Sequence, residues 1–466
     1  MTASPSTETQ AVQALDSAHF LHPFTDHAAL ARIGARVMVK AKGIYVWDTE
    51  GERVLDAMSG LWCVNVGYGR KELADAAYQQ MMTLPFYNAF FQTTNEPAVR
   101  LAARLAGLAP QVGDCHFDHV FYSSSGSESN DTNVRLVRRY WDLMGQPQRK
   151  VIIGRINGYH GSTMAGASLG GMASMHEQGD LPIPGIEHID QPYFYDKGKP
   201  GESEDEFGLR AAGWLEAKIK EVGPQKVAAF IAEPVQGAGG VIIPPSTYWP
   251  EIQRIVDKYG ILLISDEVIC AFGRLGHWFA YEKFGYRPDL ITFAKAVTSG
   301  YVPLGGVMVG NRVAQTLIAK GGEFNHGYTY SGHPTACAVA LANLDLIERE
   351  NLVARVKGEL GSYFSQRFSA LVEHPLVGAA QSCGFVAGLV LVKDKKSKKR
   401  FDSSVDVGMI CRRHCFDNGL IMRAVGDRMI VAPPLIMSQA DIDELMGLIR
   451  QALDLTLAEL KSRHLF

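Results

Sequence analysis

The middle of the chain alternates short hydrophobic runs with stretches whose apolar residues recur at helical spacing. Residues 135–145 and 247–260 show the helical spacing. Near-continuous hydrophobic runs of this length are typical of strands buried on both faces. The pattern therefore predicts an α/β fold with a mostly parallel central sheet and helices on both faces. The predicted strands are HVFYSSSG (119–126), KVIIGR (150–155), VAAFIAEP (227–234), ILLISDE (261–267), LITFAKA (290–296) and LGGVMVG (304–310).

The two ends of the chain carry a different pattern. Residues 36–58 alternate apolar and polar side chains and are interrupted at TEGE (49–52), which predicts a β-hairpin. Near the C-terminus, Ser438 and Asp441 resemble a capping box, so a final helix is expected from about Gln439. The apolar stripe of this helix would be Ile442, Leu445, Ile449 and Leu453.

The length of the chain, 466 residues, exceeds the usual limit for a single hydrophobic core. We therefore expect a large domain that carries the sheet and a small α+β domain built from both chain ends. The predicted parts are residues 1–74 and 346–466 for the small domain and 75–345 for the large one.

Composition excludes several classes of partner. Hydrophobic residues make up 47% of the chain and charged residues 20%, which is ordinary for a globular protein. The formal net charge of −3 provides no field that would attract nucleic acid or an anionic membrane. The one basic run, KDKKSKKR (393–400), is better explained as a solvated loop than as a binding patch.

The chain also lacks features of export and of metal binding. Its polar start, MTASPSTETQ, has neither the basic nor the apolar region of a signal peptide, and no apolar stretch reaches the roughly 18 residues of a membrane span. The seven cysteines are scattered. Cys411, His414 and Cys415 fit one helix face in a reducing compartment better than a metal site. We expect a cytoplasmic protein without structural metal or disulfides.

One lysine raises the question of chemistry, because Lys295 ends an apolar run in DLITFAKAVTSG (289–300). Most lysines at strand ends are solvated charges whose stems lie along apolar surface. A desolvated lysine can instead lose its proton and act as a nucleophile that forms a Schiff base. The neighbouring strand ends decide between these interpretations, since ligands of open α/β sheets bind at the carboxyl ends of the strands.

Each of the other strand ends offers a polar group. The stretch SSSGSES (123–129) could hold an anion at a helix start, or could simply cap the helix. In NGYHGST (157–163), Tyr159 or His160 could face a flat ring, or the stretch could be a tight turn. Glu233 ends one strand. Asp266 follows five apolar residues, so its carboxylate must be hydrogen-bonded or paired to stay charged.

Together these groups match the needs of pyridoxal phosphate. The cofactor requires a lysine for its aldehyde, a cradle for its phosphate, a carboxylate at its pyridine nitrogen and a planar side chain against its ring. Lys295, the 125–127 stretch, Asp266 and Tyr159 fit these four needs. The combination favours a catalytic lysine.

The block DEVICAFGRLGHW…PDLITFAKAVTSGYVPLGGVMV (266–309) closely resembles the class-III (fold type I) pyridoxal-phosphate-dependent aminotransferases. The resemblance extends from about Phe24 to the final helix. LWCVNVGYGR (61–70) and NHGYTYSGHP (325–334) are most similar to the ω-transaminases, which include amine–pyruvate and putrescine–pyruvate enzymes.

The resemblance implies a role for each matching residue in the cofactor site. Lys295 would bond to the cofactor aldehyde and move a proton, and Asp266 would bind the ring nitrogen. Val268 and Tyr159 would pack on opposite faces of the ring, with His160 beside Tyr159. Glu233 would hold its strand end or balance charge. The phosphate would be held by Ser125, Gly126 and Ser127, and by Thr329 of the neighbouring subunit, so the resemblance implies a homodimer or a tetramer made of two such dimers.

The same resemblance implies a substrate pocket. Phe24, Trp62, Phe90 and Tyr328 match residues that shape it, although without the resemblance ordinary core packing is the better explanation of such aromatic residues. Arg423 matches an arginine that pairs with the carboxylate of an acid substrate, a task suited to a bidentate guanidinium.

Two positions depart from the family pattern. Ile269 stands where some relatives carry a glutamine that contacts the ring hydroxyl, so another group must make that contact. Ala296 replaces the usual glycine after the lysine. Neither change removes a required catalytic group.

The expected activity is ping-pong transamination, with a primary amine, diamine or ω-amino acid as donor and pyruvate or a similar oxoacid as acceptor. An aminomutase or a decarboxylase would use the same cofactor residues and stays an alternative. A nucleotide-dependent oxidoreductase is disfavoured because no G-x-G-x-x-G follows the first predicted strand.

Overall fold

A seven-stranded sheet forms the centre of the computed structural model, which describes residues 5–466. Its strand order is β4-β10-β9-β8-β7-β5-β6. Strands β6, β5, β7, β8 and β9 run parallel, and β10 is antiparallel to both β9 and β4. The prediction of a mostly parallel sheet is confirmed. The strands are β4 (Phe117–Ser123), β5 (Val151–Arg155), β6 (Ile186–Ile189), β7 (Val227–Ala232), β8 (Leu262–Asp266), β9 (Leu290–Phe293) and β10 (Gly305–Gly310).

All six predicted strands are present, and β6 is an additional one. Strand β6 lies at the edge of the sheet and has only four residues, of which Glu187 and His188 are partly exposed. An edge strand with two polar residues at its centre lacks the continuous hydrophobic run that marks the buried strands. For this reason the hydrophobic pattern did not predict it.

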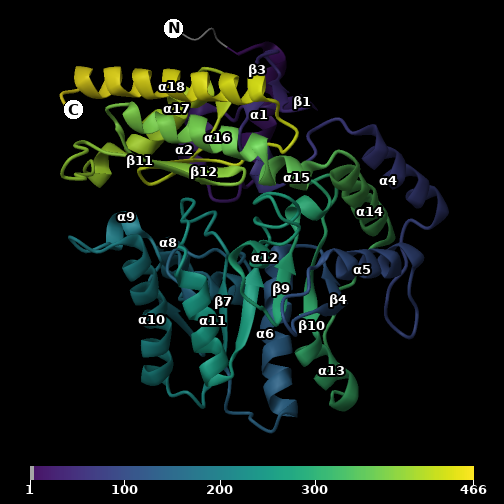
Figure 1. The fold of residues 1–466 in the computed structure, drawn as a ribbon. Coiled ribbons are helices and arrows are strands. Elements are labelled where there is room, and N and C mark those ends of the chain that lie inside the picture. Colours follow the sequence, from purple (N-terminus) through teal and green to yellow (C-terminus); the bar gives the residue numbers. More distant parts are fainter. Residues whose placement is uncertain (1–4) are drawn as a thin grey trace.

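Helices cover both faces of this sheet (Figure 1). On β8, Leu262 and Ile264 pack in one hydrophobic cluster with Leu136 of helix α6 (Gly126–Leu143). Leu263 points the other way, into the cluster that contains Ile252 of helix α11 (Tyr248–Tyr259). This alternation is the geometry of a strand buried on both faces. Helix α11 matches its prediction, and α6 begins nine residues earlier than its hydrophobic pattern suggested because its first turns are polar.

Two smaller sheets lie above the large sheet in Figure 1, one with strands from both chain ends and one with strands from the C-terminal part alone. Strand β13 (Leu420–Ile421) pairs in parallel with β3 (Arg53–Asp56), so one of these sheets joins the two ends. The hairpin predicted around 49–52 is confirmed as β2 (Tyr45–Asp48) and β3. The remaining strands are β1 (Met38–Lys42), β11 (Val377–Cys383), β12 (Val386–Leu391), β14 (Arg423–Val425) and β15 (Arg428–Val431).

The predicted domain boundaries stay predictions. The position between residues 74 and 75 falls inside helix α4 (Lys71–Thr83), and the position between residues 345 and 346 falls inside α14 (Pro334–Arg349). These two helices pack against each other, so the chain crosses between its upper and lower parts through packed helices.

The C-terminal helix α18 (Gln439–Ser462) begins at the predicted residue, and it lies along the top of the molecule in Figure 1. Ser438 and Asp441 form the predicted capping box, with each side chain accepting a hydrogen bond from the backbone of the other. The four residues of the predicted apolar stripe are all buried. The lysines of the basic segment 393–400 are exposed, as expected of a solvated loop.

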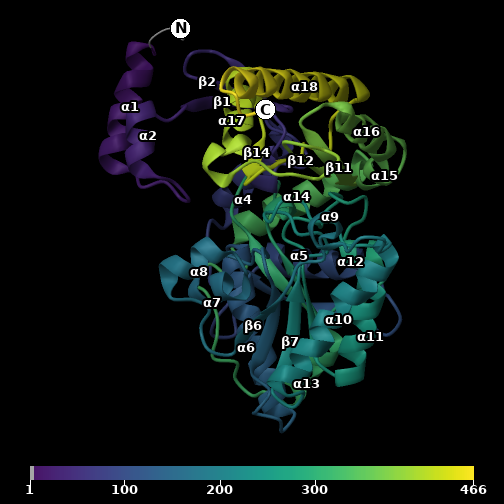
Figure 2. The same ribbon diagram turned by 90° about the vertical axis from the view of Figure 1, so that its left-hand side faces the viewer.

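Helices α1 (Thr7–His19) and α2 (His27–Ile33) stand apart from the rest of the molecule (Figure 2). The first four residues of the polar start lie outside the described residues. The other helices are α3 (Ser59–Trp62), α5 (Glu96–Leu108), α7 (Met164–Leu169), α8 (Ala173–Gly179), α9 (Phe194–Lys197), α10 (Glu204–Val222), α12 (Ala280–Phe284), α13 (Asn311–Lys320), α15 (Leu352–Lys357), α16 (Glu359–Ser369) and α17 (Val407–Asp417), with 3₁₀ turns η1 (Lys295–Val297), η2 (Ala370–Glu373) and η3 (Ser403–Val405).

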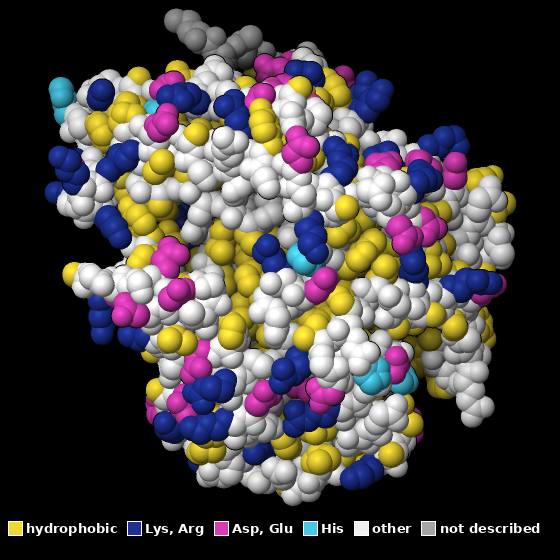
Figure 3. Space-filling view, viewed as in Figure 1, with side chains coloured by type: hydrophobic (Ala, Val, Ile, Leu, Met, Phe, Trp, Pro, Cys, Tyr) yellow, Lys and Arg dark blue, Asp and Glu magenta, His cyan; other side chains and the backbone are white. Residues whose placement is uncertain are grey.

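The surface in Figure 3 carries its charged side chains mainly above and below a central band where hydrophobic side chains gather. Within residues 5–466, no helix is both long enough and apolar enough to cross a membrane. No group of three His, Cys, Asp or Glu side chains in this part of the chain could hold a metal ion, and its seven cysteines form no disulfide.

Candidate active site

A cavity of about 330 Å³ lies at the carboxyl ends of the parallel strands, next to the start of helix α6. It brings together nine residues that the sequence singled out. These residues are Ser125, Gly126, Ser127, Tyr159, His160, Glu233, Asp266, Val268 and Lys295. Strands β7, β8 and β9 are neighbours, so the groups that follow them meet at one edge of the sheet.

Lys295 follows β9 and opens a 3₁₀ turn in a left-handed backbone conformation, with φ of 48°. Such a conformation is unfavourable for a residue with a side chain, by about 1 kcal/mol. Burial lowers the pKa of its amine, as does the positive charge of Arg423, while Cys63, Asp266 and Glu233 act in the opposite sense. Among residues 5–466, no carboxylate lies within ion-pair distance of Lys295 Nζ. The amine therefore loses its proton more readily than that of an exposed lysine.

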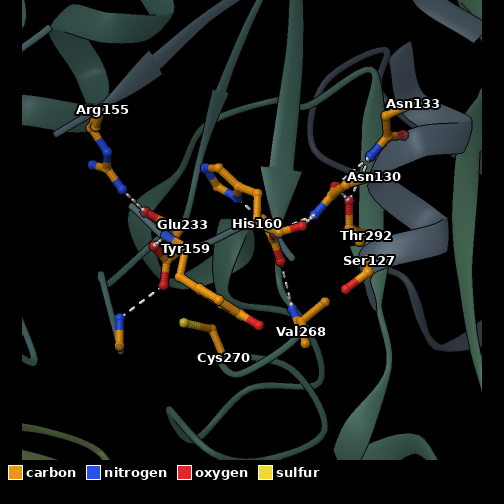
Figure 4. Close-up of polar contacts among 12 residues, drawn as sticks. Ser127, Asn130, Asn133, Arg155, Tyr159, His160, Glu233, Val268, Cys270 and Thr292 are labelled. Atoms are coloured by element: carbon orange, nitrogen blue, oxygen red, sulfur yellow. Dashed lines mark hydrogen bonds and ion pairs between the residues drawn. The ribbon is translucent and has the colours of Figure 1, made fainter. Parts of the chain in front are cut away.

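Asp266 ends β8 and is only 3% exposed. Its Oδ2 accepts hydrogen bonds from Asn130 Nδ2 at 2.8 Å and from His160 Nδ1 at 2.7 Å. Its Oδ1 accepts one bond, from the backbone N–H of Val268 at 3.2 Å, and Figure 4 shows these donors converging from separate elements. A carboxylate oxygen can accept two hydrogen bonds, so Oδ1 can accept one more, such as that of a protonated ring nitrogen.

The start of helix α6 forms an anion cradle. Ser125 is the N-cap, and its Oγ accepts a hydrogen bond from Glu128 N at 3.2 Å. The backbone N–H groups of Gly126 and Ser127 have no protein acceptor among the described residues, as is usual for the first turn of a helix. These donors and the helix dipole suit a phosphate group.

Gly126 is required by the close approach of Val268. A Cβ added to Gly126 would lie 3.0 Å from Val268 Cγ2, which is tighter than nine in ten real contacts of this kind, so Val268 would have to move by a few tenths of an ångström. The absence of a side chain therefore lets Val268 pack at the start of α6, where it lines the cavity next to the cradle.

Tyr159 and Glu233 join two loops at the cavity. Glu233 Oε1 accepts a hydrogen bond from Tyr159 N at 3.1 Å, and its Oε2 accepts one from Gly237 N at 2.9 Å. Burial raises the pKa of Glu233, as does the nearby charge of Asp266, while the hydrogen bond from Gly237 N and the charge of Arg155 lower it. The geometry favours the interpretation that Glu233 holds the strand end. It also fixes the backbone from which the Tyr159 ring projects into the cavity.

The residues expected to shape the substrate pocket do not line this cavity. Trp62 is 1% exposed and packs in a hydrophobic cluster with Ile269, which does line the cavity. Phe24 is 75% exposed, with its ring centroid 6.4 Å from that of Tyr159. Phe90 lines a separate, larger groove of about 880 Å³. One chain therefore brings together the cofactor residues but leaves these aromatic residues dispersed.

Tyr328 and Thr329 lie behind the start of α6. The hydroxyl of Tyr328 donates to the carbonyl of Glu128 at 2.8 Å, and Thr329 is exposed. Arg423, on β14, is half-buried, and burial lowers the pKa of its guanidinium. Its positive charge acts on Lys295, which places it near the cavity.

Asn130, Cys63 and Thr298 also line the cavity but were not singled out in the sequence. Asn130 lies in the polar first turns of α6, where Ser129, Thr132 and Asn133 are also buried, so no hydrophobic pattern marks it as a buried residue. Ile269 lies against Gly237, where an added Cβ would be 2.5 Å from Ile269 Cδ1, so this side of the cavity is tightly packed.

These groups fit pyridoxal phosphate: an amine for the aldehyde, a carboxylate with a remaining acceptor site for the ring nitrogen, and helix N–H groups for the phosphate.

The comparison with known families leads to the same cofactor. The chain belongs to the class-III aminotransferases, whose family model matches residues 29–453. Members of this family use pyridoxal phosphate, and the fold is that of the fold-type I enzymes.

Individual relatives extend over nearly the whole chain. The chain is 57% identical to the putrescine–pyruvate aminotransferase of Pseudomonas aeruginosa, over 97% of both proteins. The ω-transaminase of Pseudomonas jessenii in complex with PMP superposes with a TM-score of 0.94 at 39% identity, covering 97% of this chain and 99% of that one. An (S)-enantioselective ω-transaminase from Thermomicrobium roseum gives 0.92 at 44% identity, covering 96% and 99%.

Changing Gly126→Ala should weaken cofactor binding. The added methyl group would push Val268 into the cavity, and overpacking of this kind costs about 1–3 kcal/mol, so the dissociation constant of pyridoxal phosphate should rise about tenfold. Equilibrium dialysis measures it. Gly213→Ala on α10, where an added Cβ meets nothing within 4 Å, is the matched control and should bind normally. Unchanged affinity in the Gly126 variant would contradict the cradle.

Proposed function

We propose that this aminotransferase moves an amino group from a primary amine, a diamine such as putrescine or an ω-amino acid to pyruvate or a similar oxoacid. The observation that carries the proposal is the unpaired amine of Lys295 in one cavity with Asp266 and the start of α6. The extensive identity to a putrescine–pyruvate enzyme supports the choice of substrates.

The roles of the residues follow from their chemistry. Pyridoxal phosphate, when bound, supplies an aldehyde that bonds to amines and a ring that accepts electrons. Lys295 Nζ would take the proton from the Cα of the donor and later deliver a proton to the acceptor. Its lowered pKa suits this exchange, because general bases work best when their pKa is near the operating pH. Asp266 Oδ1 would keep a proton on the ring nitrogen.

The cavity wall holds the cofactor in place. The N–H groups of Gly126 and Ser127, with the hydroxyls of Ser125 and Ser127, would bind the phosphate. Tyr159 and Val268 would pack against the flat ring. His160 would act through Asp266, to which its Nδ1 is bonded. No polar side chain at position 269 is available for the ring hydroxyl.

Arg423 would bind the carboxylate of pyruvate. It is half-buried and its positive charge reaches Lys295, so an acid bound there would lie next to the reacting amine. A buried guanidinium gains strong, paired hydrogen bonds from a carboxylate. Phe24 and Tyr159, with rings in edge contact, would border the apolar part of the donor.

We further propose that the active unit is a homodimer. Large hydrophobic side chains are exposed on α1, on α2, on the segment between them and on residues 86–91, including Leu21 at 80%, Ile33 at 80% and Phe91 at 90%. Exposed apolar surface of this extent marks an interaction site. Phe90 and Thr329 would then complete the site of the partner subunit, which accounts for their distance from the cavity of their own chain.

Replacing the lysine by Lys295→Ala should abolish transfer while leaving the cofactor bound. Loss of the proton-transfer group should lower kcat/KM more than about 10³-fold, measured as alanine formed from pyruvate and putrescine. Borohydride should trap the cofactor on residue 295 only in the unchanged protein. The exposed Lys320→Ala is the control. A rate near that of the unchanged protein would refute the assignment, and amine consumption without pyruvate would favour an aminomutase or a decarboxylase.

Removing the guanidinium by Arg423→Leu should weaken pyruvate binding specifically. Charged hydrogen bonds contribute about 1.5–3 kcal/mol, so the KM for pyruvate should rise about tenfold or more. The amine half-reaction, followed by absorbance without pyruvate, should keep its rate because a plain amine has no carboxylate. Arg412→Ala removes an exposed positive charge nearby and should change neither step. Equal losses in both half-reactions would argue against this role.

Mixing two inactive variants should restore activity if the subunits share their sites. Lys295→Ala lacks the amine, and Thr329→Glu would repel the phosphate of the partner's site. In a mixed dimer, one site keeps both Lys295 and Thr329, so random mixing should recover about a quarter of normal activity. A chain carrying both changes, mixed with Lys295→Ala, should stay inactive. No recovery in the first mixture would show that Thr329 does not act across subunits.

A further inference from the structure

A cluster of buried amide and hydroxyl groups lies directly behind Asp266. Asn130 and Asn133 come from α6 and Thr292 from β9, and all three are fully buried (Figure 4). Asn130 Nδ2 donates to Asp266 Oδ2 and to the backbone carbonyl of His160, both at 2.8 Å. Asn130 Oδ1 accepts from the Thr292 hydroxyl at 2.8 Å and from Asn133 Nδ2 at 2.9 Å.

These four contacts allow only one orientation of the Asn130 amide. Its nitrogen faces two groups that can only accept, and its oxygen faces two groups that donate. The Thr292 hydroxyl itself accepts from Asn133 Nδ2 at 2.7 Å, so its proton is directed to Asn130 Oδ1. A rotated amide would place its oxygen against the carboxylate of Asp266, and two buried donors would lose their acceptor.

Asn130 also joins the elements that carry the parts of the cofactor site. It lies on α6 one turn beyond the anion cradle, and it is bonded to the end of β8 and to the loop after β5. Its partner Thr292 is three residues before Lys295 on β9. A single amide thus connects the cradle, the acid, the ring-packing loop and the strand that precedes the lysine.

We propose that Asn130 is a positioning residue, which holds Asp266 as a charged carboxylate with Oδ1 directed toward the cofactor ring nitrogen. The inference rests on the role proposed above for Asp266. A carboxylate buried in this way needs hydrogen bonds to remain ionised, and Asn130 supplies one of the two to Oδ2. The ionisable groups that surround Asp266 are His160 after β5, Glu233 after β7, Glu267 after β8 and Lys295 after β9.

Two variants of Asn130 test the proposal. Asn130→Leu keeps the size of the side chain and removes the donor, so the dissociation constant of pyridoxal phosphate should rise about tenfold. The pH midpoint of the visible absorption of the loaded protein should shift upward. When the ring nitrogen carries less positive charge, the Lys295 nitrogen bonded to the cofactor keeps its proton to a higher pH. Asn130→Asp has the same shape, and when protonated it still donates to Asp266.

The pH dependence separates positioning from simple support of the fold. Two adjacent carboxylates in a buried site share one proton and titrate as a pair. Asn130→Asp should therefore bind the cofactor and react nearly normally at low pH, and lose both as the shared proton leaves at higher pH. The leucine variant should be impaired at every pH. A structural role alone would change the melting temperature of both variants without a pH-dependent loss of affinity.

Two further variants make the outcomes distinguishable. Ser168→Ala removes a buried hydroxyl from α7, bonded to Met164 O and Ile183 N, and should bind the cofactor normally. Asp266→Asn should lose affinity and change the absorption spectrum. If it does so while both Asn130 variants bind normally at all pH values, the positioning role is refuted and the site stands. If Asp266→Asn itself behaves normally, the proposed role of Asp266 fails and this inference falls with it.

Discussion

The site depends on keeping a carboxylate charged where water hardly reaches it. Removing an ionised acid from water costs several kcal/mol unless hydrogen bonds replace its hydration. Asp266 is 3% exposed and receives hydrogen bonds from Asn130, His160 and the N–H of Val268. Because these donors come from α6, from the loop after β5 and from its own loop, the acid can keep its charge only when the three elements are assembled correctly.

Lys295 is also removed from water, but unlike Asp266 it has no close partner within residues 5–466 that stabilises its charge. No carboxylate pairs with its amine among the described residues, and burial lowers its pKa. Asp266 and Lys295 lie at neighbouring strand ends in one cavity, but only the acid is hydrogen-bonded to donors. The base has no close partner of opposite charge in the described part of the chain. This difference suits chemistry in which one group holds a proton steadily at the ring and the other exchanges protons with the substrate.

The sequence predicted those parts of the fold and site that depend on local pattern. The six predicted strands and the capped helix α18 are marked by their own hydrophobic runs and end residues. The meeting of Glu233, Asp266 and Lys295 follows from a general property of parallel sheets, that their strands end at one edge. Strand β6 was not predicted, because half of its residues are polar.

Partners that lie far apart in the chain could not be predicted in the same way. Asn130 is 136 positions from Asp266 and 162 from Thr292, and nothing near it in sequence indicates either contact. The resemblance to the family pointed to Trp62 and Phe90 as pocket residues. Their actual places, in a buried cluster and in a separate groove, depend on how whole elements pack. Local pattern determines which residues are buried, and the tertiary fold determines which of them meet.

One buried arginine, Arg274, connects the segment that starts at Asp266 to the upper part of the molecule by hydrogen bonds. Arg274 is fully buried, and desolvation lowers its pKa to about 9. Its Nη1 donates to the carbonyls of Phe385, at 3.2 Å, and Pro433, while its Nη2 donates to Asn65 Oδ1. It has no acidic partner among residues 5–466, so two backbone carbonyls, the Asn65 amide oxygen and the Ser59 hydroxyl, at 3.3 Å from Nη2, replace its hydration. Those oxygens come from both chain ends, and separating them from Arg274 would leave a buried charge without acceptors. Burying a charge without hydrogen-bond partners is costly for Arg274, as it is for Asp266 eight residues earlier. Because the acceptors of Arg274 come from both chain ends, this cost holds both ends against the loop that begins at Asp266.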